Sequence, residues 1–84
     1  MRYTVLWSPD AENDLAAIWL AANDRTAVTA AGNQIDTFLH QDAHLQGESR
    51  HGRLRILFIP PSAVDFEAIR DDRIARVLTV WRWQ

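Results

Sequence analysis

The alternation of apolar and polar residues predicts an opening strand, two amphipathic helices and three closing strands. Over residues 2–7, Tyr3, Val5 and Trp7 fall at every second position and are expected to share the buried face of a half-buried strand. Over residues 11–45 the apolar side chains recur every three or four positions, which is the spacing of one helix face. The alternation of strands returns over residues 53–83, after a loop at residues 46–52 that contains two glycines.

Ser8 and Pro9 predict where the first helix begins, because serine is a preferred N-cap and proline suits the first helical position. The polar residues 23–25 separate it from a second helix, which we expect to run to about Leu45. So short a connection predicts an antiparallel helical hairpin, and Gly32 predicts that the helices pack closely. The expected apolar stripes are Ala11, Leu15, Ile18, Trp19 and Ala22 on the first helix, with Asp10, Asn13 and Asp14 away from it, and Val28, Ala31, Ile35, Phe38 and Leu39 on the second.

Turn signals connect the three closing strands, with Pro60-Pro61-Ser62 after the first and Asp71-Asp72 after the second. If Asp71 and Asp72 form a two-residue turn, Glu67 lies directly across from Arg76 and forms a cross-strand ion pair with it. The face predicted to receive the helices carries Leu54, Ile56, Phe58, Val64, Phe66, Ala68, Ala75, Val77, Thr79 and Trp81. The opposite, open face is predicted to carry Arg53, Arg55, Leu57, Ile59, Asp65, Glu67, Ile69, Ile74, Arg76, Leu78, Val80 and Arg82.

These elements predict one α+β domain over residues 1–84, in the order β-α-α-β-β-β, with the helical hairpin packed on one face of a small antiparallel sheet. A hydrophobic content of 48% is enough for a core, so the chain should fold rather than remain disordered. Without cysteine there is no disulfide framework, and no signal peptide or membrane-length apolar run is present, so we expect a cytoplasmic protein without a membrane partner.

Charge is distributed unevenly along the chain. Residues 1–48 contain two Arg and seven Asp or Glu, whereas residues 49–84 contain seven Arg and four Asp or Glu. All nine basic residues are arginine, which favours bidentate contacts with carboxylate or phosphate. Asp36, His40 and His44 have a spacing that would align metal ligands, but a fourth ligand is missing. We therefore expect a solvent-facing stripe there, and no metal or cofactor.

Several segments taken in order resemble the RelE/ParE superfamily of small toxins from bacterial type II toxin–antitoxin systems. They are the opening strand running into Trp7-Ser8-Pro9-Asp10-Ala11, then Asp14-Leu15 and Ile18-Trp19, the apolar Ala31, Ile35 and Leu39, the entry Gly52-Arg53-Leu54-Arg55, and the closing Arg76-Val77-Leu78-Thr79-Val80-Trp81. The resemblance covers nearly the whole chain. It implies a toxin that is neutralised by a cognate antitoxin protein, with the family's sheet-and-hairpin fold.

Two activities follow from the resemblance: ribosome-dependent cleavage of mRNA, as in RelE-like members, or inhibition of DNA gyrase, as in ParE-like plasmid stabilisation proteins. The chain departs from the mRNA-cleaving members because it has no Lys, its only Tyr is Tyr3, Phe66 stands where many members have Tyr, and no His follows the last strand. These departures favour a gyrase inhibitor over an enzyme. A non-toxic module that retains only antitoxin binding is the third alternative.

RNA cleavage without a metal requires a proton acceptor, a proton donor and cations around the phosphate. If the chain is RelE-like, the catalytic candidates are His51, Arg53, Arg55 and Arg82, with His51 as the proton carrier. Trp83 has little chain left to cover it and is expected to be an exposed aromatic anchor. The predicted partner-binding residues are Arg53, Arg55, Leu57, Arg76, Leu78, Val80, Arg82 and Trp83.

Overall fold

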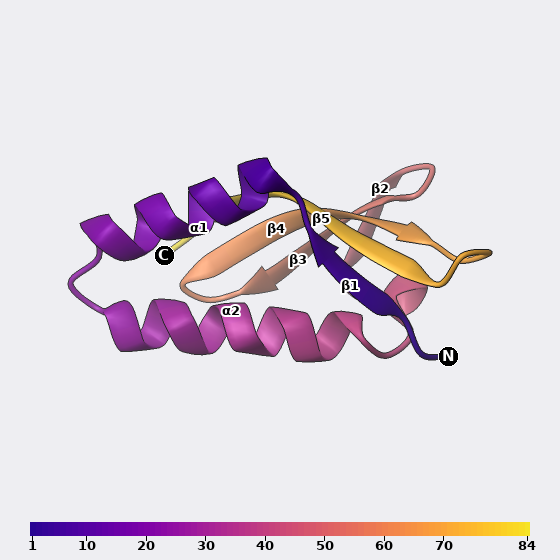
Figure 1. The fold of residues 1–84 in the computed structure, drawn as a ribbon, viewed down its shortest axis with the longest axis horizontal. Helices are drawn as coiled ribbons and strands as arrows, with labels where there is room; N and C mark the ends of the chain where they lie inside the picture. The colour runs from indigo at the N-terminus through magenta and orange to yellow at the C-terminus, as the bar shows by residue number, and fades with distance from the viewer.

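The computed structural model describes residues 1–84 and confirms an α+β fold with two helices on one face of a sheet (Figure 1). The predicted strand and helix order is correct, with one strand added. The elements are β1 (Thr4–Trp7), α1 (Pro9–Ala21), α2 (Arg25–Leu39), the short 3-10 helix η1 (Ala43–Leu45), β2 (Glu48–His51), β3 (Leu54–Ile59), β4 (Ser62–Ile69) and β5 (Ile74–Arg82).

The sheet has five strands in the order β1-β5-β4-β3-β2 and is mixed rather than purely antiparallel. Strand β1 lies parallel to β5, with Val5 opposite Ala75 and Trp7 opposite Val77, so the apolar side of β1 extends the apolar side of β5. The added strand, β2, lies at the other edge, in the segment that we expected to be a loop. Every residue of β2 is exposed, so the strand has no apolar pattern by which the sequence could predict it.

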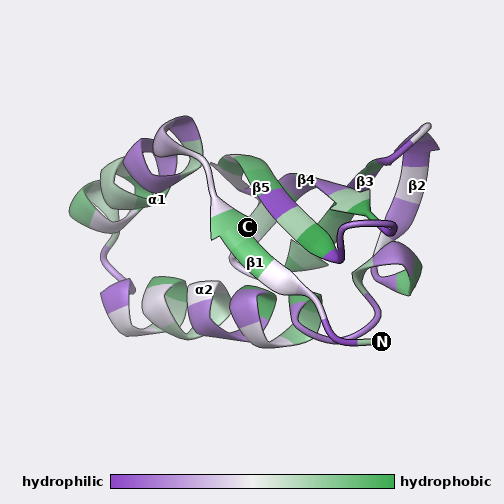
Figure 2. Ribbon diagram, turned by 45° about the vertical axis from the view of Figure 1, so that its right-hand side comes forward, coloured by the Kyte–Doolittle hydropathy of each residue, from purple (hydrophilic) through white to green (hydrophobic).

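The core lies between the two helices and one face of the sheet. Figure 2 shows hydrophobic segments along β1 and β5, whereas β2 is hydrophilic. Tyr3, Val5 and Trp7 turn toward the core as predicted, with Tyr3 almost completely buried. The other core residues are Ala11, Ile35, Leu39, Ala43, Leu57, Val64, Phe66, Ala68, Ala75, Val77 and Val80.

Helix α1 begins as the sequence predicts. The Ser8 hydroxyl accepts a hydrogen bond from the Ala11 backbone N–H at 3.0 Å, and Pro9 occupies the first helical turn. The same hydroxyl donates to the carbonyl oxygen of Leu78 in β5 at 3.0 Å, so the cap also attaches the helix to the sheet. Asp14, which we expected to face away from the protein, instead accepts a hydrogen bond from the Val80 backbone N–H at 3.1 Å.

The two helices form the predicted hairpin, but they do not pack as closely as Gly32 suggested. A Cβ atom at Gly32 would lie 3.5 Å from Leu15 Cδ2, an ordinary van der Waals contact. Helix α1 lies against β5, whereas α2 lies against β3 and β4. Trp19, which we expected in the core, consequently remains 39% exposed.

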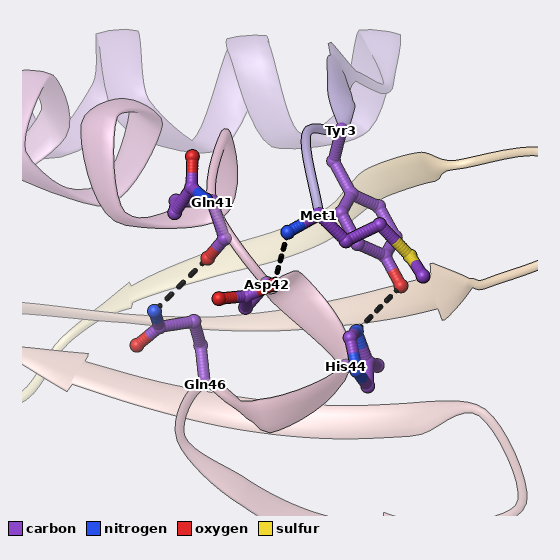
Figure 3. A network of polar contacts seen from close by, with 6 residues as sticks. All are labelled: Met1, Tyr3, Gln41, Asp42, His44 and Gln46. Atoms are coloured by element: carbon purple, nitrogen blue, oxygen red, sulfur yellow. Dashed lines mark hydrogen bonds and ion pairs between the residues drawn. The ribbon is translucent and has the colours of Figure 1, made fainter.

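Helix α2 ends at Leu39, earlier than the expected end near Leu45, because the chain reverses at Asp42 (Figure 3). Asp42 adopts a left-handed backbone with φ 51°, and its N–H donates to the Met1 carbonyl. Its carboxylate accepts a hydrogen bond from the Met1 amino group at 2.6 Å. In η1, His44 Nδ1 lies 2.8 Å from the Tyr3 hydroxyl. These contacts hold the N-terminal segment against the end of α2.

Candidate functional site

A β-bulge in β5 determines which residues reach the open face. Up to Val77 the pairing is the predicted one, with Glu67 opposite Arg76 and Phe66 opposite Val77. Beyond it the register shifts, so Asp65 pairs with Thr79 and Leu78 becomes the extra, half-buried residue. Because of the inserted residue, every later side chain of β5 lies on the face opposite to the predicted one.

The reversal corrects four of the predicted positions in β5. Val80 pairs with Val64 and is buried in the core, and Arg82 also lies on the helix side, so neither belongs to the open face. Thr79 and Trp81 lie on the open face, although we expected both to face the helices.

Strand β3 presents the opposite face to the one predicted. Leu57 pairs with Val64 and is buried, and Arg55 pairs with Phe66, so both lie on the helix side. Ile59, also predicted to be on the open face, pairs with Ser62 on the helix side. Leu54, Ile56 and Phe58 therefore occupy the open face. The sequence signal that would have revealed this is the two-residue turn at Pro60-Pro61, since it places residue 57 across from residue 64.

Arg55 is engaged with the backbone of the loop before β2. Its Nε donates to the Gln46 carbonyl at 2.7 Å, and its Nη2 donates to the Gly47 carbonyl at 3.2 Å. The arginine thus satisfies two carbonyl groups that no strand neighbour pairs. Its location indicates a structural contact at the edge of the sheet.

We define the open face as the sheet surface that bears no helix. It carries Leu6 of β1, Glu48 and His51 of β2, Leu54, Ile56 and Phe58 of β3, Asp65 and Glu67 of β4, Arg76, Thr79 and Trp81 of β5, and the flanking Arg53 and Trp83. The register places these side chains side by side across five strands. They form an ionic region and an aromatic region.

The ionic region consists of Glu67 between two arginines. The carboxylate of Glu67 lies 3.7 Å from Arg76 Nη1 and 3.7 Å from Arg53 Nη2, which confirms the predicted Glu67–Arg76 pair. The arginine side chains stay accessible, with Arg53 63% exposed and Arg76 44% exposed. Two guanidinium groups around one carboxylate leave donors free for an anionic partner, while Asp65 and Glu48 on the same face offset the positive charge.

The aromatic region lies at the other end of the open face. The Phe58 and Trp83 rings stack in a tilted arrangement with their centroids 5.0 Å apart. Ala63 pairs with Phe58 on one side and Trp81 on the other, and these two larger side chains account for its complete burial. Trp83 is 48% exposed, as its position in the sequence predicted.

Arg82 forms a clamp with Asp24 at the tip of the helical hairpin. Its Nη1 and Nη2 atoms donate to the two carboxylate oxygens of Asp24 at 2.8 and 2.7 Å. This bidentate pair lowers the pKa of Asp24 and raises the pKa of Arg82. The Asp24 side chain consequently makes no capping hydrogen bond to α2.

The clamp predicts a loss of stability in acid. The pKa of Asp24 in the folded protein is lower than its unfolded value of about 3.9. The clamp therefore contributes its full stabilisation above the unfolded pKa and loses it as the pH falls through the folded pKa. The free energy of unfolding should therefore differ between the native chain and Asp24→Asn at pH 7, and this difference should shrink below about pH 4. Denaturant titrations from pH 2.5 to 7 measure it. A difference that stays constant over this range would contradict the clamp.

The four residues predicted as catalytic do not converge on one place. Arg53 lies on the open face, which it shares with the exposed His51 of the edge strand β2, whereas Arg55 and Arg82 lie on the helix side. His44, which the sequence aligned with Asp36 and His40, contacts Tyr3 instead. No group of three His, Asp or Glu side chains is arranged to hold a metal ion.

Comparisons with solved structures identify the fold. A chain of the RelBE2 toxin–antitoxin complex of Mycobacterium tuberculosis matches 98% of this chain over 92% of its own, with a TM-score of 0.77 and 14% identity. A chain of the ParDE toxin–antitoxin system of P. aeruginosa aligns with 99% of this chain and 98% of its own length, with a TM-score of 0.70 and 20% identity. A mutant of the E. coli toxin RelE aligns with 98% of this chain and 84% of its own length, with a TM-score of 0.70 and 10% identity.

The chain has the RelE/ParE toxin fold. The structural neighbours include both RelE and ParE systems, at similar TM-scores. No protein-family model matches the sequence, and no curated protein does at a significant level. The RelE/ParE fold of this chain contains no helix that is both long and apolar enough to cross a membrane.

Proposed function

We propose that this protein is the toxin of a toxin–antitoxin pair, that a cognate antitoxin protein neutralises it in the cytoplasm, and that it inhibits DNA gyrase as a ParE-like member. The observation that carries the proposal is the open face on a RelE/ParE fold, with Arg53 and Arg76 around Glu67 at one end and the exposed Trp83 at the other. Exposed aromatic side chains and arginines on one face are typical of a protein-binding surface.

Inhibition by binding needs this surface alone, whereas RNA cleavage also needs a proton acceptor and a proton donor beside the phosphate. The separation of Arg53 from Arg55 and Arg82, on opposite faces of the sheet, therefore supports a gyrase inhibitor over a metal-independent endoribonuclease that acts on the ribosome and mRNA. The partner-binding residues in this proposal are Arg53, Arg76 and Trp83, together with Phe58 and Trp81 from the same face.

Induced expression without an antitoxin should arrest growth, and the purified protein should inhibit gyrase supercoiling. The double variant Arg53→Ala with Arg76→Ala should weaken inhibition at least about tenfold, since several charged contacts would be lost. The control is Arg50→Ala with Arg70→Ala, which removes the same charge from exposed positions that form no ion pair with Glu67.

Three outcomes separate the candidates. Cleavage of mRNA in a translating extract that disappears in His51→Ala, with supercoiling unaffected, would overturn the gyrase proposal in favour of an RNA-cleaving toxin. Unaffected growth would instead favour a module that binds an antitoxin without being toxic. Equal loss of inhibition in the two double variants would show that the open face does not bind gyrase.

A further inference from the structure

A groove of about 660 Å³ opens between α1 and α2, on the helix side of the protein and away from the open face. Its apolar walls are formed by Trp7, Leu15, Trp19, Leu20, Val28 and Gly32. The groove exists because α1 lies against β5 while α2 lies against β3 and β4. Its volume falls within the range of about 300–1,000 Å³ that is usual for small-molecule sites.

The charged groups of this groove have one sign. Glu12 and Asp36 are its ionisable lining residues, and both are acidic. Asp36 is held in place at the wall, because its Oδ1 accepts a hydrogen bond from Trp7 Nε1 at 3.1 Å. On the side of Asp36 toward the end of α2, His40 Nδ1 lies 3.5 Å from its Oδ2.

Arg25 shows that an indole of this groove can hold a cation. Its guanidinium lies 4.5 Å above the Trp19 ring, and its donors are engaged by the carbonyl oxygens of Trp19 and Leu20. It lines a neighbouring hollow rather than the groove itself, so it leaves the negative charge of Glu12 and Asp36 unbalanced.

We propose that the groove binds a small lipophilic amine. The apolar body would lie against the two tryptophans and Leu20, which is 66% exposed at the rim, and the ammonium group would lie against Asp36 and Glu12. Burial of the hydrocarbon supplies the affinity, and the two carboxylates select a cation over a neutral or anionic molecule of equal length. This site is separate from the open face and does not depend on the proposed function.

Calorimetric titration at pH 8 with octylammonium, octan-1-ol and octanoate, each below its aggregation concentration, tests the proposal. Octylammonium should bind about fivefold more tightly than octanoate, with octan-1-ol between them, because these carboxylates are partly exposed to solvent. Asp36→Asn should reduce the preference for the amine to less than about twofold while octan-1-ol binding stays unchanged.

Two leucine variants test whether the groove is the site. Ala16→Leu fills the groove and should weaken all three ligands at least about fivefold, since a leucine would occupy the apolar space. Ala17, the next residue of α1, lines a different hollow. Ala17→Leu should therefore leave binding of all three ligands unchanged. No binding of octylammonium at millimolar concentration, equal affinity for octanoate, or equal effects of the two leucine variants would overturn the proposal.

Discussion

Gly47→Ala should destabilise the protein by at least about 3 kcal/mol, because an alanine at this position combines an unfavourable backbone with a steric overlap. Gly47 has φ +65°, in the left-handed region that residues with a Cβ atom rarely adopt. Its Cβ would overlap the Ile56 carbonyl oxygen and lie 2.8 Å from the carbonyl carbon. Both atoms belong to the backbone of β3, so no side chain can move aside. Denaturant unfolding at 25 °C measures the loss.

Gly52→Ala is the matched control for this effect. Gly52 has a similar left-handed backbone, with φ +56°, but a Cβ atom there would meet nothing within 4 Å. Its substitution should therefore cost only the conformational term, about 1–2 kcal/mol. Because the stability of small domains is modest, Gly47→Ala should leave a substantial fraction of the chain unfolded. Equal losses in the two variants would show that the backbone approach between Gly47 and Ile56 is absent.

Asp14→Ala should cost about 1–3 kcal/mol, because the Val80 N–H beside the bulge would lose its acceptor in a partly buried position. Alanine favours a helix more than aspartate does, so the measured loss would underestimate that of the hydrogen bond. Urea unfolding gives the free energy. Hydrogen exchange at the Val80 amide gives a local measurement and should become faster in the variant.

Two further variants separate the hydrogen bond from a general effect of substitution in α1. Asp14→Asn keeps a side-chain oxygen that can accept from Val80, so it should lose less than half as much stability as Asp14→Ala. Asn13→Ala, at an exposed neighbouring position, should change stability by less than about 0.5 kcal/mol. If Asp14→Ala behaves like Asn13→Ala, then Asp14 does not support the bulge.

The parts of the candidate site that the sequence predicted correctly depend on local geometry. The Glu67–Arg76 pair follows from a turn a few residues away. The parts that it missed depend on strands that meet from distant positions. Arg55 and Leu57 lie in a strand with apolar residues on both sides, so alternation alone does not identify the buried side.

The amino-acid sequence by itself determined the two helices, the start of α1 at Ser8 and Pro9, and the order of the main strands, because capping and apolar spacing act over a few residues. Only the tertiary structure decided that β1 joins β5 in parallel and that the bulge at Leu78 turns Arg82 toward Asp24. One inserted residue reverses every later side chain of a strand, and its position is set by contacts such as Asp14 with Val80 that are far apart in the chain. The surface available to a partner therefore depends on pairing that local patterns do not encode.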